Sequence, residues 1–293
     1  MKNDLISASD ERALTASDWA GASGERWLAN LDSLERMIEP IGAALLSHAN
    51  YRPGESVVDI GCGGGWTTRR IASAVGPEGG VVGVDISPAL IQAARGRARA
   101  EEIANIAFEV ADAGNVKPVG TPFDRLFSRF GSMFFADPYA AFANLRRMLV
   151  DGGRLDLAVW ALPGENPWFT AMMGVLAQHV ELPPPVPRAP GPFALGETDY
   201  VRDLLGNAGF DEPDIIAWEG TQFIGGPGNG AEEAATFTLE SLHIGDLIKD
   251  LDPSRQAGVR DDLVSMFAGR ETPEGVGLPS KALFVTAHAG RRA

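Results

Sequence analysis

The stretch SVVDIGCGGGWTTRR, residues 56–70, decides the fold. Its run of β-branched residues predicts a buried strand, and the amphipathic WTTRRIASAV that follows predicts a helix. Between the two, glycine occupies four of the five positions from 61 to 65. Glycine at the end of a buried strand lets the backbone turn sharply and come close to a ligand. The stretch therefore predicts a binding loop at the carboxyl end of a central strand.

Strand and helix patterns alternate along most of the chain. The segments that read as strands are residues 56–62, 79–87, 106–113, 123–131, 154–162, 214–226 and 281–290. Amphipathic helices follow the first, second and fourth of these segments. Short apolar strands separated by helices are typical of a parallel sheet that is covered on both faces. We therefore expect a Rossmann-like α/β fold with a seven-stranded, mostly parallel sheet.

Composition narrows the class of partner. The 293 residues carry a formal net charge of −14, which argues against nucleic acid and against an anionic membrane surface as partners. The single cysteine, Cys62, excludes an intramolecular disulfide and a cysteine-rich metal site. The first residues show neither a signal-peptide core nor an apolar run of membrane-spanning length. We expect a cytoplasmic enzyme.

An acidic residue follows the glycine loop at a telling distance. Asp85 ends the second predicted strand, about 20 residues beyond Gly65, where a carboxylate meets a ribose in nucleotide-binding folds. A dinucleotide fingerprint needs a third glycine, but Trp66 and Thr68 stand at the two positions where it could fall. The loop also has no Lys or Arg between residues 56 and 68, so the pattern favours a ligand without phosphate.

The motif D-x-G-x-G-x-G, from Asp59 to Gly65, resembles the first motif of class I S-adenosylmethionine-dependent methyltransferases, with Gly64 in place of the commoner threonine. VVGVDIS, VADAG and the segment from residue 123 to 155 resemble the later motifs in the same order. SRFGSMFF and PGPFAL are similar to the ubiquinone/menaquinone C-methyltransferase-like family. The resemblance covers about residues 19–210.

The resemblance implies S-adenosylmethionine as the cofactor and S-adenosylhomocysteine as its product, without a metal. It implies that Asp85 holds the ribose, that Asp112 and Ala113 meet the adenine, and that Asp59 lies near the ammonium group. The full set of implied cofactor-binding residues is Trp27, Asp59, Gly61, Gly63, Gly65, Asp85, Ile86, Asp112, Ala113 and Ser128.

We expect an N-terminal helical cap over residues 1–52 and a methyltransferase domain over residues 53–293. Two segments are too long for simple connections and predict insertions, at about 163–195 and 226–270. In this fold such insertions build the acceptor pocket. Each holds one histidine that could serve as a general base, His179 and His243, although a satisfied structural histidine is the commoner role.

The acceptor side is less specific. SRFG stands where amide-nitrogen methyltransferases carry a D/N-P-P-Y box, and it offers no carboxylate for a divalent metal. An apolar wall could be formed by Phe130, Met133, Trp160, Trp168 and Phe169, although ordinary core packing is equally compatible with each. We therefore expect metal-independent transfer to a carbon, oxygen, nitrogen or sulfur atom of a small, hydrophobic acceptor.

Three alternatives remain open from the sequence. The first is a nicotinamide-dependent oxidoreductase, against which the missing third glycine counts. The second is a non-catalytic protein that keeps the nucleotide site. The third binds S-adenosylmethionine but performs another reaction with it. The oligomeric state cannot be read from the residues.

Overall fold

The computed structural model describes residues 16–290. Its sheet has eight strands in the order β3-β2-β1-β4-β5-β8-β6, with the short β7 paired to β8. The strands are β1 (Ser56–Ile60), β2 (Gly80–Asp85), β3 (Ile106–Val110), β4 (Phe123–Arg129), β5 (Leu149–Trp160), β6 (Asp214–Phe223), β7 (Glu271–Thr272) and β8 (Gly275–His288). The first five are parallel, and β8 runs antiparallel to both β5 and β6.

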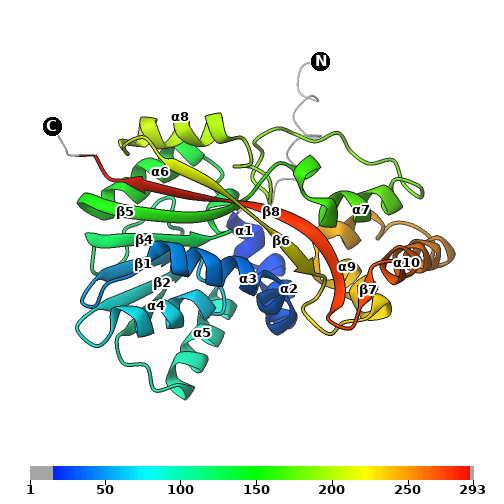
Figure 1. The fold of residues 1–293 in the computed structure, drawn as a ribbon, viewed down its shortest axis with the longest axis horizontal. Coiled ribbons are helices and arrows are strands. Elements are labelled where there is room, and N and C mark those ends of the chain that lie inside the picture. Colours follow the sequence, from blue (N-terminus) through cyan, green and yellow to red (C-terminus); the bar gives the residue numbers. More distant parts are fainter. Residues whose placement is uncertain (1–15, 291–293) are drawn as a thin grey trace, which may run out of the picture.

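Helices cover both faces of this sheet (Figure 1). The α-helices are α1 (Ala16–Ala20), α2 (Ala22–Ala29), α3 (Leu31–Ala49), α4 (Trp66–Val75), α5 (Pro88–Ala100), α6 (Pro138–Arg147), α7 (Pro167–Leu176), α8 (Thr198–Ala208), α9 (Ala231–Ser241) and α10 (Pro253–Ala268). Short 3₁₀ turns are η1 (Ser132–Phe134), η2 (Pro163–Glu165) and η3 (His243–Leu247). The predicted fold class is confirmed: seven strands form the main sheet, and β7 adds a two-residue hairpin.

Local sequence explains where several helices begin and end. Ser87, Asp137 and Asp252 each accept a hydrogen bond from a backbone N–H of the first turn, and a proline follows each of them at the first helical position. Helix α8 ends at Gly209, which adopts a left-handed conformation with φ 88° that glycine accepts without strain. These caps fix the connections between the strands.

Two strands begin earlier than the sequence predicts. β5 starts at Leu149 rather than at residue 154, and a register shift between Phe123 and Arg125 of β4 accommodates its early part. β8 starts at Gly275 rather than at residue 281, because its first residues pair with the end of β6 and with β7. Pairing with a distant strand therefore extends both segments beyond their apolar cores.

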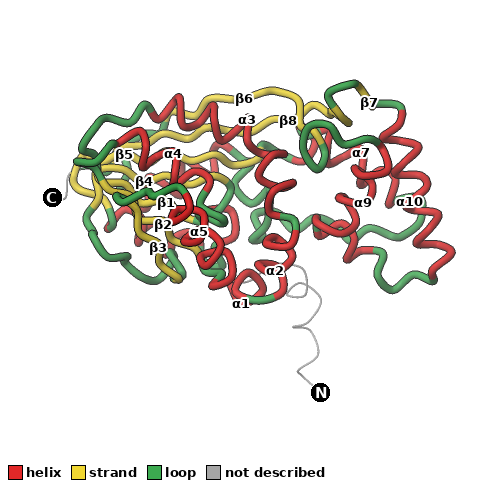
Figure 2. The backbone as a smooth tube through the Cα atoms, turned by 90° about the horizontal axis from the view of Figure 1, so that it is seen from below, coloured by secondary structure: helices red, strands yellow, loops and turns green. Residues whose placement is uncertain are grey.

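Helices α7, α9 and α10 gather beyond one end of the sheet, while α1 and α2 lie beside the middle of the molecule (Figures 1 and 2). On α10 the buried side chains Val259, Leu263 and Phe267 recur every four residues and form one apolar face. That face belongs to the same hydrophobic core as the sheet strands. Within residues 16–290, no helix combines the length and apolar character needed to cross a membrane.

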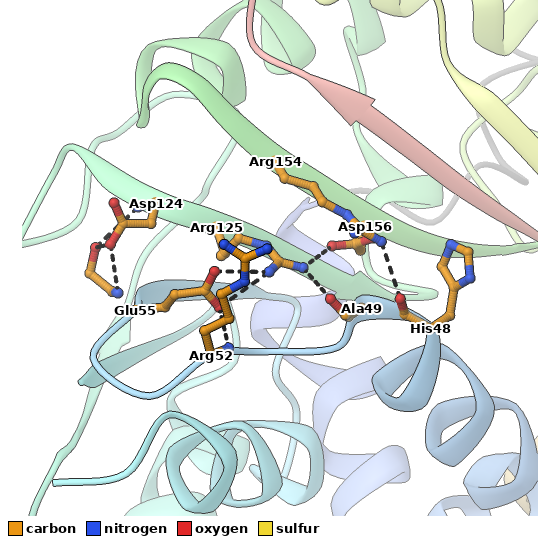
Figure 3. Close-up of polar contacts among 9 residues, drawn as sticks. His48, Ala49, Arg52, Glu55, Asp124, Arg125, Arg154 and Asp156 are labelled. Atoms are coloured by element: carbon orange, nitrogen blue, oxygen red, sulfur yellow. Dashed lines mark hydrogen bonds and ion pairs between the residues drawn. The ribbon is translucent and has the colours of Figure 1, made fainter. Parts of the chain in front are cut away.

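A buried ionic cluster fixes the end of α3 to the sheet (Figure 3). Arg125 of β4 donates to Asp156 Oδ2 at 2.9 Å and to the Ala49 carbonyl at 2.6 Å. Arg154 donates to the other oxygen of Asp156 at 2.7 Å and to the His48 carbonyl at 3.2 Å. Asp156 is fully buried. The two arginines thus bind the last carbonyls of α3 and are held together by one carboxylate.

We predict that Asp156→Ala lowers the free energy of unfolding by about 3–5 kcal/mol, because it leaves the buried guanidinium of Arg125 and the half-buried guanidinium of Arg154 without their shared carboxylate. Urea denaturation followed by circular dichroism measures the loss. Glu212→Ala, which breaks the exposed pair between Glu212 and Arg202, is the matched control and should leave the midpoint nearly unchanged. Equal losses in the two variants would contradict the role of the cluster.

Candidate cofactor and acceptor site

The order of the strands reverses between β1 and β4, and this is the point where open parallel sheets bind ligands. Backbone approaches backbone closely here. A Cβ atom on Gly61 would lie 2.6 Å from the Cα of Gly131. The Ser128 hydroxyl, fully buried at the end of β4, donates to the Ile60 carbonyl at 2.8 Å. The ends of β1 and β4 therefore form one rigid edge.

The loop between β1 and α4 depends on left-handed backbone conformations. Gly61, Gly63 and Gly65 have φ values of 67°, 53° and 77°. Gly65 packs against α5 and β3, where a Cβ would lie 3.0 Å from Ala94 and 3.1 Å from Phe108. Backbone conformation favours glycine at all three positions, and lack of space favours it in addition at Gly61 and Gly65.

Asp85, at the end of β2, faces this loop. Its Oδ2 accepts from the Gly63 N–H at 2.8 Å, and its Oδ1 accepts from the Ser87 N–H at 2.9 Å. Burial raises the pKa of Asp85, and the backbone hydrogen bonds oppose that shift. Because each carboxylate oxygen has two lone pairs, both oxygens can accept a further hydrogen bond. The arrangement suits a vicinal diol such as that of a ribose, and Ile86 follows directly in the chain.

The third predicted acid, Asp112, lies just beyond β3 at the same edge of the sheet. Its Oδ1 accepts from the Gly114 N–H at 2.8 Å, and Asn115 donates to Oδ2. The Ala113 carbonyl accepts from the Asn144 side chain of α6 at 2.9 Å. Asp85 and Asp112 thus occupy the carboxyl ends of neighbouring strands, and the turn that holds Asp112 and Ala113 is anchored to α6.

Asp59 lies beneath the loop, 1% exposed. Thr67 and Thr68, at the start of α4, both donate to its Oδ2 at 2.7 Å. Its Oδ1 is buried, and no donor within residues 16–290 reaches it. Burial raises the pKa of Asp59 to about 6, while the threonines and Arg129 oppose the rise. One oxygen is therefore left for a donor that the chain does not supply, which fits the ammonium group of a bound ligand.

Helices α2 and α3 cover the loop from above. The Trp27 Nε1 lies 3.9 Å from the position of a Cβ on Gly63, and a Cβ on Gly24 would lie 2.5 Å from the Ser87 Oγ. At Gly64 a side chain would collide with Leu31 and Glu35 of α3, at 2.7 and 2.8 Å. Packing against α3 thus favours glycine where the commoner motif has threonine.

The helices that cover the loop, which we call the cover, contact the second predicted insertion through α2. Arg26 of α2 donates to both oxygens of Asp246 in η3, at 2.8 and 2.9 Å, and its guanidinium lies 3.2 Å from His243 Nδ1. Trp19 of α1 contacts Trp27 and Phe134 edge to face, with ring centroids 5.8 and 4.9 Å apart. We call the Arg26–Asp246 pair the latch.

The two candidate bases have different surroundings. His243 lies beside the latch, and its ring is 6.4 Å from that of Trp19, so it is connected to the cover over the loop. His179 instead contacts α10, where its Nε2 lies 2.7 Å from Asp262 Oδ2 and Arg255 donates to its carbonyl. The geometry places His243 beside α1 and α2 and holds His179 against α10.

The predicted apolar residues come together as one aromatic cluster. Phe130 stacks on Trp160 at 4.4 Å, and Trp160 contacts Trp168 at 5.1 Å. Met133 and Phe169 adjoin this cluster: the Met133 sulfur accepts from the backbone N–H of Trp160 at 3.5 Å, and the ring of Phe169 is 5.8 Å from that of Trp168. Phe130 has φ 65°, a conformation that bulky residues rarely adopt outside strained functional sites.

Sequence reasoning missed Phe193, whose ring lies 4.7 Å from that of Phe169. The signal was present in the PGPFAL segment, which was read for its resemblance and not for its aromatic residue.

Among residues 16–290, no group of three or more His, Cys, Asp or Glu side chains is placed to hold a metal ion. Burial raises the pKa of Cys62 well above its usual range.

Residues 57–153 match the family model of a methyltransferase domain. A malonyl-[acyl-carrier protein] O-methyltransferase of Hahella chejuensis is 30% identical over 153 residues, 52% of this chain and 52% of that protein. A ubiquinone/menaquinone biosynthesis C-methyltransferase of Ectopseudomonas mendocina is 37% identical over 120 residues, 41% of this chain and 46% of that protein. The chain spans about half the length of the curated relatives it matches.

Solved structures share the fold. The YcgJ protein of Bacillus subtilis superposes with a TM-score of 0.56 at 15% identity, covering 86% of this chain and 98% of that one. A phosphoethanolamine N-methyltransferase of Haemonchus contortus, solved with S-adenosylhomocysteine, gives a TM-score of 0.55 at 17% identity, covering 95% and 59%. At these identities the likeness concerns the fold alone.

We predict that Gly61→Ala destabilises the ligand-free protein by roughly 2–5 kcal/mol, because it adds an overlap with Gly131 to the strain of a positive φ. Gly63→Ala is the matched control: its φ is equally positive, but its Cβ would meet its nearest atom at 3.9 Å. The control should lose roughly 1–2 kcal/mol. Chemical denaturation compares the two, and a Gly61 variant as stable as the Gly63 variant would refute the close approach.

Proposed function

This chain carries a class I S-adenosylmethionine-dependent methyltransferase domain, and from that premise we propose that the protein transfers the methyl group of S-adenosylmethionine to a small-molecule acceptor. The observation that carries the proposal is the Asp85 carboxylate, fixed by the Gly63 and Ser87 amides at the switch point of the sheet. A carboxylate so oriented matches the two ribose hydroxyls of the cofactor.

The other acids extend the same assignment. Asp112, with Ala113 and Ile86, would meet the adenine ring at the ends of β2 and β3. The free Oδ1 of Asp59 would accept from the ammonium group, and the backbone at Gly61 and Ser128 would line the same end. Trp27 would lie over the bound methionine portion. When bound, the cofactor supplies an activated methyl group as a sulfonium, so the protein has to provide position and exclude water.

The electrostatics support this cofactor over a dinucleotide. Asp59 and Asp85 both flank the loop, and carboxylates there would repel a pyrophosphate while attracting a sulfonium and an ammonium. A nicotinamide-dependent reaction remains the alternative that the binding experiment below tests directly.

The acceptor is proposed to be hydrophobic and the transfer to be metal-independent. The aromatic cluster of Phe130, Trp160, Trp168, Phe169 and Phe193 supports an apolar acceptor, since stacked rings offer flat apolar surface. His243 is the better placed of the two candidate bases because it adjoins the cover over the loop.

Net charge of −14 supports a small molecule and not nucleic acid or membrane as partner. The boundary near residue 52 between an N-terminal cap and a catalytic domain stays a prediction, and so does the cytoplasmic location. Residues 1–15 of the predicted cap and residues 291–293 of the predicted catalytic domain lie outside the described part of the chain.

We predict that S-adenosylmethionine and S-adenosylhomocysteine bind with micromolar affinity and that Asp85→Ala weakens both at least about tenfold, the usual minimum for loss of charged hydrogen bonds. Calorimetry measures binding, with NAD(H) as a comparison ligand. Asp214→Ala, exposed at the start of β6, is the control and should bind normally. Binding of NAD(H) in place of the sulfur ligands would overturn the proposal; binding without methyl transfer to any acceptor in a screen would leave a non-catalytic protein.

We predict that S-adenosylhomocysteine binds about tenfold more tightly at pH 7 than at pH 5. Asp59 has a pKa of about 6 in the free protein, and a neighbouring ammonium group lowers it, so binding releases a proton and tightens as the pH rises. Thr67, Thr68, Arg129 and Asp85 influence this carboxyl group, so Asp59→Asn serves to isolate its contribution. The variant should lose the pH dependence; an unchanged slope would show that another group titrates.

A further inference from the structure

A guanidinium group lies beside the glycine loop without a hydrogen-bond or ion-pair partner. Arg129 is the last residue of β4, and it makes no hydrogen bond and no ion pair within residues 16–290. Its Nη1 is buried. Buried polar atoms in native proteins nearly always have a partner, and a guanidinium carries five donors. The exception therefore requires an explanation.

The surroundings are shaped to hold this side chain. A Cβ on Gly42 of α3 would lie 2.7 Å from the Arg129 Nη1 and 3.0 Å from the ring of Trp66. The guanidinium carbon is 4.9 Å from the centre of the Trp66 ring, and Trp66 is the first residue of α4, directly after Gly65. Glycine in α3 and the aromatic ring thus leave a cradle for the arginine between the cover and the loop.

The nearby carboxylates are already engaged. Glu35 pairs with Arg97 at 2.7 Å, and Glu39 pairs with Arg70 at 3.6 Å. Asp59 gives one oxygen to its threonines and keeps Oδ1 unpaired. Burial lowers the pKa of Arg129 to about 10, while Glu35 and Asp59 act in the opposite direction from a distance. The Arg129 Nη1 is therefore buried without a carboxylate in direct contact.

Two unpaired groups of opposite charge, the Asp59 Oδ1 and the Arg129 guanidinium, consequently lie close to one glycine loop. The amino-acid end of S-adenosylmethionine is a zwitterion that presents one ammonium and one carboxylate. We propose that Arg129 binds the carboxylate of the donor's amino-acid end, opposite the ammonium partner Asp59. The planar fork of a guanidinium matches a carboxylate, and the flexible stem lets it swing toward the loop as that group arrives.

This inference rests on the proposed function, so the test uses two ligands whose binding distinguishes failure of the inference from failure of the proposed function. Decarboxylated S-adenosylmethionine keeps the adenosine, the sulfonium and the amine and lacks the carboxylate alone. The wild-type protein should bind S-adenosylmethionine about 10- to 100-fold more tightly than the decarboxylated form, the range for a hydrogen bond to a charged group. This ratio needs no variant, so it is independent of any folding defect.

The variant Arg129→Met keeps the length of the stem and removes every donor. It should bind S-adenosylmethionine about 10- to 100-fold more weakly than wild type and bind the decarboxylated form as wild type does. Arg70→Met is the matched control, since the Arg70 guanidinium also lies over the Trp66 ring, 3.6 Å from its centre, and it pairs with Glu39. It should leave both affinities unchanged. Calorimetry gives all six values, and ligand-free melting monitors folding.

Equal weakening of both ligands by Arg129→Met would overturn the proposal, because it would mark a structural role for the arginine. So would a wild-type protein that binds both ligands equally. Wild-type protein that binds neither S-adenosylmethionine nor S-adenosylhomocysteine would overturn the proposed function together with this inference, whereas normal binding without discrimination would overturn the inference alone.

Discussion

The close approach of Gly61 to Gly131 is the constraint on which the rest of the site depends. It brings the end of β1 against the turn that follows β4, at the point where the strand order reverses. With those two ends joined, the glycine loop turns back over Asp59, and its Gly63 amide reaches Asp85 on the neighbouring strand. Side chains at this junction would separate the strands and, with them, the acids that the loop organises.

Local pattern was sufficient to predict the sheet and the acidic edge. Buried strands are recognisable in the sequence as short apolar runs. Asp59, Asp85 and Asp112 lie at or just beyond the ends of three such runs, so parallel topology places them at one edge of the sheet. The starts of β5 and β8 were not predictable in the same way. Those residues become strand because β4, β6 and β7 supply hydrogen-bond partners, and the partners are remote in sequence.

The parts of the site that escaped prediction depend on contacts between distant segments. Arg129 reads as an ordinary polar residue at the end of a strand until Gly42, Trp66 and the other carboxylates are placed around it. In the sequence Glu35 is one residue of an amphipathic helix; only the structure shows that its side chain packs against Gly64. The sequence placed one histidine in each predicted insertion, and in the structure His243 lies near Trp19 and His179 against Asp262.

The latch has a consequence for modularity. It joins α2 to η3 across about 220 residues of chain, so the cover over the loop depends on a carboxylate that the later insertion supplies. An insertion exchanged between related proteins to alter acceptor preference would arrive without the carboxylate that Arg26 binds. A replacement of the second insertion would therefore have to keep a carboxylate at the position of Asp246 to preserve this contact with α2.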